Sequence, residues 1–233
     1  PGRVDYLHYL ADLLAEGDPT AIPRGEKINV LDIGTGSGLL AMMAARAGAK
    51  NIFACEMNTD LAHVAERIIA KNNYSDKIKV LHKKSSAIDI GIDIPNKVDV
   101  LVSEIFDSGL LGEGVFPSLR HAQCSLLKEN AIIIPKSADV YGMLVQSDEL
   151  KAIHPIKTIS GFDLEIFNEF QVSNQYSTSF SGQDKHKPLS DVFPIHSFDF
   201  YKIPEERTKD NPHRKTFEVT ATADGEFQAI VFW

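Results

Sequence analysis

Two groups of residues in this sequence have the types and spacing to handle cationic ligands. The first is a glycine-rich turn, Gly34, Gly36 and Gly38, with Asp32 two residues ahead of it. Such a turn between a strand and a helix presents backbone N–H groups to a ligand. Position 39 is Leu, where the dinucleotide fingerprint has a small residue. A carboxylate at the turn repels a pyrophosphate and attracts an ammonium group.

The predicted ligand is therefore cationic near the turn and carries a ribose, a description that S-adenosylmethionine fits. Glu56 supplies the sugar contact in this interpretation, because it ends the next apolar stretch. An acid about 20 residues beyond the glycine turn is placed to accept ribose hydroxyls. The alternative is that the glycines make only a tight turn, that Asp32 caps it and that Glu56 is an ordinary strand end.

The second group is a pair of glutamates, Glu104 and Glu113, nine residues apart in a glycine-containing loop. The loop follows an apolar run, and ligands bind at the carboxyl ends of strands in open α/β sheets. Two carboxylates that converge on one point match the planar fork of a guanidinium. Asp107, between them, either adds acidity or caps a turn. The alternative for the pair is a surface loop with two solvated acids.

The elements that must position these residues alternate along the first part of the chain. Short apolar runs predict strands at 30–33, 51–56, 78–81, 98–102 and 131–134. Helical spacing predicts helices at 4–14, from 39 to about 48, from 59 or 60 to 69, and at 116–127. Nearly continuous apolar strands that alternate with helices are typical of a parallel sheet covered on both faces.

The pattern changes after Pro135. Strand-like runs occur at 138–145, 198–201, 216–220 and 229–233, and polar loops lie at 181–191 and 204–214. This arrangement predicts an antiparallel β domain appended to an α/β domain. We expect a cofactor-binding domain at residues 1–135 and a β domain at residues 136–233.

Composition narrows the function classes. The chain has 233 residues, a formal net charge of −8 and no basic run, which argues against a nucleic-acid surface and favours basic partners. Two cysteines form no disulfide framework, which predicts a reducing compartment. We see no membrane-spanning run and no signal sequence. Because the chain begins at Pro1 and stops in an apolar run at Trp233, we expect a fragment of a larger protein.

The sequence resembles the protein arginine N-methyltransferase family. The resemblance covers nearly the whole chain and is carried by four motifs: 30–38, Cys55-Glu56, the loop from Glu104 to Glu113, and Ile134-Pro135, where the family's β-barrel begins. The amino-acid sequence of the glutamate loop is similar to that of the seventh and ninth members, which form monomethyl or symmetric dimethyl arginine.

This resemblance implies a Rossmann-like methyltransferase sheet followed by an incomplete antiparallel β-barrel. It implies transfer of a methyl group from S-adenosylmethionine to a guanidino nitrogen of arginine in proteins, with S-adenosylhomocysteine as the product. The cofactor-binding residues that it implies are Asp32, Gly34, Gly36, Glu56 and Ser86. The catalytic residues that it implies are Glu104 and Glu113, and it implies no metal.

The resemblance also implies arginine-rich protein substrates, such as histone tails or segments of RNA-binding proteins, and a cytoplasmic or nuclear location. It implies a dimer or pseudo-dimer, without direct nucleic-acid or membrane binding. A helix that folds over the cofactor and a histidine loop in the family would lie beyond Pro1 and Trp233, so we expect an incomplete site. Two alternatives stay open: a small-molecule methyltransferase on the same sheet, and a catalytically silent protein-binding module.

Overall fold

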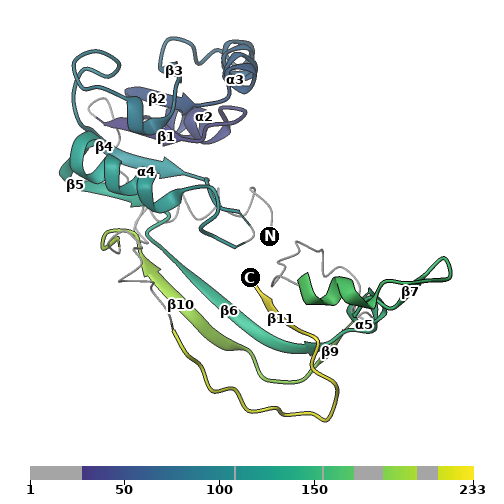
Figure 1. The fold of residues 1–233 in the computed structure, drawn as a ribbon. Helices are drawn as coiled ribbons and strands as arrows, with labels where there is room; N and C mark the ends of the chain where they lie inside the picture. The colour runs from purple at the N-terminus through teal and green to yellow at the C-terminus, as the bar shows by residue number, and fades with distance from the viewer. Residues whose placement is uncertain (1–27, 108, 154, 171–185, 204–214) are drawn as a thin grey trace. The chain divides into compact units, whose positions relative to one another are not determined.

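The structure, a computed structural model, describes residues 28–107, 109–153, 155–170, 186–203 and 215–233 (Figure 1). These residues form two compact units, each described here by itself. The first ends at Ala138 and takes in the segment that begins at Phe198, and the second contains Asp139–Ser197 and the C-terminal residues. The helix predicted at 4–14 lies outside the described residues.

The first unit is built on a five-stranded parallel sheet with the order β3-β2-β1-β4-β5 (Figure 1). Its strands are β1 (Asn29–Ile33), β2 (Asn51–Glu56), β3 (Ile78–His82), β4 (Val98–Ser103) and β5 (Leu127–Ile134). The predicted α/β class and parallel sheet are confirmed. All five strands have the predicted positions, except that β5 begins four residues earlier than the run at 131–134.

Both faces of this sheet are buried. Alternate residues of the central strands, such as Val30, Ile52 and Val100, belong to one apolar cluster with Ala41 of α2 and Ile69 of α3. Side chains of neighbouring strand positions point to opposite faces, and these positions are also covered: Leu31 and Leu101 have no exposed surface. The apolar runs that predicted a doubly covered sheet therefore have this physical origin.

Helices connect the strands of the first unit. They are α2 (Leu39–Arg46), α3 (Thr59–Lys71) and α4 (Val115–His121), with a short 3-10 turn η1 (Ser85–Ala87). A π-helical turn, η2 (Ala122–Leu126), extends α4, so the predicted helix at 116–127 is present as two consecutive segments. The Asn58 side chain caps α3 by accepting hydrogen bonds from the N–H groups of Asp60 and Leu61.

The second unit contains an antiparallel sheet in which β6 (Ser137–Gln146) is central. Strand β11 (Ala229–Phe232) and strand β9 (Lys187–Pro188) pair with it in antiparallel fashion. Strand β10 (Phe193–Asp199) lies on the opposite side of β6 from β11, in the order β10-β6-β11. Short elements follow β6: α5 (Asp148–Ile153), the hairpin β7 (Thr158–Ile159) and β8 (Phe162–Asp163), and the 3-10 helix η3 (Glu165–Phe170).

The predictions from the sequence were less accurate for the second unit than for the first. The antiparallel character is confirmed, whereas the barrel stays a prediction. No strand forms at 216–220, and β9 lies within the predicted loop at 181–191. Strand β10 begins five residues before the predicted run at 198–201, and the predicted loop at 204–214 lies outside the described residues. Among the described residues, no helix combines the length and apolar character required to cross a bilayer.

Candidate functional site

The glycine turn after β1 is fixed to the end of β2 by backbone hydrogen bonds. The N–H groups of Gly34 and Thr35 both donate to the carbonyl oxygen of Cys55, at 3.0 and 3.1 Å. Gly34, Gly36 and Gly38 all have positive φ, at 75°, 53° and 80°, a region that favours glycine. The turn predicted from the sequence therefore exists at the carboxyl edge of the sheet.

Two of the glycines are needed because other elements come close. A Cβ on Gly38 would lie 3.0 Å from the side chain of Ile69 in α3. A Cβ on Gly34 would lie 2.5 Å from Cγ2 of Ile105 and 3.6 Å from the carbonyl oxygen of Glu104. The turn thus contacts the beginning of the glutamate loop, because β1 and β4 are neighbours and Ile33 pairs with Ser103.

Gly36 differs from the other two. Within the part of the chain that the structure describes, a Cβ there would meet only the Gly34 carbonyl oxygen, at 4.0 Å. The turn is therefore open at Gly36, as a close approach by a ligand requires. This is the position at which the sequence places a bound cofactor.

The Glu56 carboxylate is held in place by the backbone at the end of β2. Its Oε2 accepts a hydrogen bond from the Gly36 N–H at 3.1 Å, and its Oε1 accepts one from the Asn58 N–H at 2.9 Å. Only 7% of the residue is exposed. Glu56 is thus fixed directly beside the glycine turn, and each oxygen keeps lone-pair capacity for a further donor.

Asp32 lies beneath the turn and is completely buried. Its Oδ2 accepts a hydrogen bond from the Thr35 hydroxyl, whereas its Oδ1 is buried with no hydrogen-bond partner among the described residues. Burial, reinforced by the nearby Glu56 charge, raises the pKa of Asp32 to about 7. Asp32 therefore supports the turn from below, and its direct contact with an ammonium group stays a prediction.

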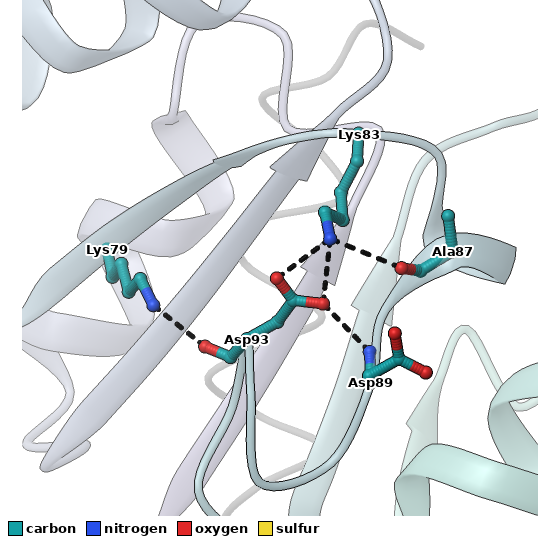
Figure 2. Close-up of polar contacts among 5 residues, drawn as sticks. All are labelled: Lys79, Lys83, Ala87, Asp89 and Asp93. Carbon is teal, nitrogen blue, oxygen red and sulfur yellow. Dashed lines mark hydrogen bonds and ion pairs between the residues drawn. The ribbon is translucent and has the colours of Figure 1, made fainter.

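Ser86 lies in η1 and is exposed. The segment that carries it is tied down by one ion pair, shown in Figure 2. The Lys83 ammonium contacts both Asp93 carboxylate oxygens at 2.8 Å and the Ala87 carbonyl oxygen at 3.3 Å. Asp93 also accepts a hydrogen bond from the Asp89 N–H at 2.8 Å. Lys83 is the principal cause of the lowered pKa of Asp93.

The glutamate loop begins at Glu104, which is partly buried, and reaches Glu113, which is exposed and precedes the N-cap Gly114 of α4. The carboxylate of Asp107 accepts a hydrogen bond from the Gly112 N–H at 2.9 Å. Of the two roles weighed for Asp107, the structure therefore shows turn capping. The convergence of Glu104 and Glu113 on one point stays a prediction.

Sequence reasoning missed several residues that hold this site. Thr35 and Asn58 bind the two buried carboxylates, and Lys83 and Asp93 close the segment around Ser86. Thr35 carried a signal, because its hydroxyl makes the contact and it is a small polar residue next to a predicted strand end. Asn58 carried none, because it binds Glu56 through its backbone N–H. The ion pair carried none, since its partners are ten residues apart in a stretch with several other charges.

Comparisons with known proteins agree with this geometry. Residues 20–134 match the family described as ribosomal protein L11 methyltransferase (PrmA). An arginine N(omega)-methyltransferase of Streptomyces achromogenes subsp. streptozoticus is 44% identical over 216 residues, which cover 92% of this chain and 58% of that protein. Protein arginine N-methyltransferase 7 of Cricetulus longicaudatus is 35% identical over 230 residues, which cover 90% of this chain and 32% of that protein.

Solved structures show the same fold. The Trypanosoma brucei PRMT1 enzyme-prozyme complex with AdoHcy matches with a TM-score of 0.65 and 22% identity, over 86% of this chain and 65% of that one. Arabidopsis thaliana protein arginine methyltransferase 10 matches with a TM-score of 0.63 and 22% identity, over 86% of this chain and 60% of that one.

The strand order and the solved structures show a Rossmann-like α/β domain, and residues 20–134 of it are similar to a methyltransferase family. More specifically, the chain is similar to arginine N-methyltransferases, among them the seventh protein arginine methyltransferase, so the predicted resemblance is confirmed. The chain spans only 58% and 32% of the length of the two curated relatives described above.

We predict that Gly34→Ala destabilises the first unit by about 2–4 kcal/mol, because a Cβ adds a clash with Ile105 to the strain of positive φ. Gly91→Ala is the matched control, since Gly91 has φ +86° and no atom of the described residues lies within 4 Å of the added Cβ. It should cost about 1–2 kcal/mol, the strain alone. Urea denaturation measures both, and equal losses would show that the contact with Ile105 is not tight.

A second prediction concerns Asp32. Its folded-state pKa of about 7 exceeds the ordinary 3.8, so the folded state binds the proton more tightly. Its stabilising contribution is full below pH 3.8 and is lost as the pH rises to 7. Relative to wild type, Asp32→Asn should therefore gain about 2 kcal/mol of unfolding free energy between pH 5 and pH 7.

Urea denaturation at several pH values measures this difference. The control is Asp76→Asn, which removes an exposed carboxylate before β3 and should follow the wild-type pH dependence. Parallel curves for wild type and Asp32→Asn would contradict the burial of an acid under the turn.

A third prediction tests the ion pair in Figure 2. Asp93→Asn weakens the charge-assisted bonds to Lys83, so amide exchange in residues 85–93 should accelerate by about tenfold through local opening. Asp89→Asn is the control, because Asp89 contributes its backbone N–H to this cluster. Hydrogen-exchange mass spectrometry resolves the segment. Equal exchange rates in the two variants would show that the ion pair does not hold residues 85–93 in place.

Proposed function

We propose that this chain transfers a methyl group from S-adenosylmethionine to a guanidino nitrogen of arginine in protein substrates. One observation carries the proposal: the glycine turn suited to the cofactor lies against the backbone of Glu104, where the glutamate loop begins. The similarity to arginine N-methyltransferases over nine-tenths of the chain supports the same reaction.

The residues of the turn suit the cofactor. Gly36 is open to a ligand and Glu56 is fixed beside it, which favours binding of the methionine end at the turn and of the ribose at Glu56. Among the described residues the buried Oδ1 of Asp32 has no hydrogen-bond partner, which leaves acceptor capacity beneath the same turn. Ser86, exposed in η1, is placed one strand further along the edge and would contact the adenine.

The acids would deal with an electrostatic problem, because donor and acceptor are both cations. When bound, S-adenosylmethionine supplies a methyl group and keeps the electrons of the broken bond on its sulfur, which leaves S-adenosylhomocysteine. Glu104 and Glu113 would offset the repulsion and draw positive charge toward the nitrogen that is not attacked. The attacked nitrogen then loses its proton readily, and most of the rate would come from orientation and preorganised charge.

The net charge of −8 favours basic substrates, so we propose arginine-rich segments such as histone tails. Cys55 and Cys124 are both unpaired thiols, which supports a cytoplasmic or nuclear location. A dimer or pseudo-dimer belongs to the same proposal. The T. brucei neighbour is described as a heterotetrameric complex.

The assay should offer the enzyme two acceptors, an arginine-rich peptide and arginine itself. The relatives' names distinguish these forms, since one names arginine and the other protein arginine. Mass spectrometry of the products also separates monomethyl from dimethyl arginine. Methylation of the peptide supports the proposal. Methylation of arginine alone would make free arginine, and not a protein, the substrate. Binding of S-adenosylhomocysteine without transfer to either acceptor would contradict the proposed activity.

We predict that Glu104→Gln lowers methyl transfer by about 10²-fold or more, because removal of a preorganised charge costs about 3–4 kcal/mol in a water-excluded site. Calorimetry with S-adenosylhomocysteine should show nearly unchanged affinity. Glu129→Gln, on the exposed side of β5, is the control and should keep full activity. A wild-type rate of methyl transfer in Glu104→Gln would show that Glu104 takes no part in the reaction.

A further inference from the structure

A second cluster of chemically active side chains lies at the same sheet edge, outside the residues assigned to methyl transfer. His63 and Glu66 are three residues apart on α3, and His82 is the last residue of β3. The Glu66 carboxylate lies between the two imidazoles: Oε1 is 2.9 Å from Nε2 of His82, and Oε2 is 3.3 Å from Nδ1 of His63. The rings themselves meet edge to face, with centroids 4.6 Å apart.

These distances match the ligand set of a metal ion. One ligand atom from each of the three residues lies within 4.8 Å of the other two. In a tetrahedral zinc site with bonds of about 2.0–2.1 Å, neighbouring ligand atoms are roughly 3.3–3.5 Å apart. The two carboxylate–imidazole distances, 3.3 and 2.9 Å, are near this value, and the two imidazole nitrogens lie within 4.8 Å of each other, so rotamer adjustments of the two histidines would place an ion between the three groups.

The chemistry of the donors narrows the class of ion. Two imidazole nitrogens and one carboxylate oxygen suit zinc and its neighbours in the first transition series, whereas magnesium and calcium prefer oxygen ligands alone. The same three-ligand set, with a fourth position left to water, is one of the known arrangements for zinc.

We propose that His63, Glu66 and His82 form a surface site for a divalent transition-metal ion of the zinc class. The site does not depend on the proposed methyl transfer. It lies next to the predicted ribose position, because His82 is the register partner of Glu56 across β2 and β3. An ion held there would join α3 to the end of β3, one strand away from Glu56 at the same sheet edge.

The competing interpretation is that the cluster only connects helix and strand by hydrogen bonds. Both interpretations predict some loss of stability when His82 is replaced, so the stability of a His82 variant without metal does not distinguish them. They differ in the response to added metal. A metal site gains stability that rises with the logarithm of the free zinc concentration once that concentration exceeds the Kd, whereas a hydrogen-bonded cluster gains none.

The experiment titrates zinc chloride into the untagged 233-residue chain at pH 7.5, by calorimetry and by thermal unfolding. A Cys124→Ser background removes the exposed thiol, which would otherwise compete for zinc. Substitution by cobalt adds a spectroscopic readout, because tetrahedral cobalt with nitrogen and oxygen ligands absorbs strongly in the visible range. We expect one zinc ion per chain and an increase in melting temperature.

His82→Asn and Glu66→Gln should each weaken zinc binding by about tenfold or more, as expected when one of three ligands is lost, and should abolish the cobalt absorption. His196→Asn, which removes a histidine from β10 in the second unit, should leave both signals unchanged. The proposal is overturned if the chain shows no saturable zinc binding, or if His82→Asn binds zinc as wild type does.

Discussion

The candidate site depends on two backbone hydrogen bonds that join neighbouring strand ends. The N–H groups of Gly34 and Thr35 donate to the carbonyl of Cys55, so the turn after β1 cannot move independently of the end of β2. Because Glu56 follows Cys55 and in turn accepts from the Gly36 N–H, the turn and the acid hold each other. Parallel pairing of β1 with β4 then brings Glu104 to the same edge.

The sheet was predictable because its signal is local and redundant. Five apolar runs, each bounded by turn residues, leave few other arrangements, and the glycine spacing marks where the first strand turns. The end of α4 was less accessible, because no local pattern separates the π-helical turn at Ala122–Leu126 from a regular helix. The second unit was harder again: β9 has only two residues, and the alternation at 216–220 forms no strand.

The site residues divide in the same way. Residue types placed Asp32, Glu56 and Glu104 at or near strand ends, since an acid within two residues of the end of a predicted strand is visible in the sequence. Their surroundings were not visible. The complete burial of Asp32 depends on how the turn folds over it, and the capping role of Asp107 depends on the path of the loop back to Gly112. Spacing gives position along the chain, whereas burial and partner come from tertiary packing.

The contacts of Glu56 have a thermodynamic consequence. Both oxygens of this side chain are anchored by main-chain donors, so its rotamer is selected before any nucleoside arrives. Freezing a glutamate side chain costs up to about 1.5–2 kcal/mol of conformational entropy. Here that loss is incurred during folding, and the sugar would meet a rigid acceptor whose geometry does not need to be reorganised for each round of ligand exchange.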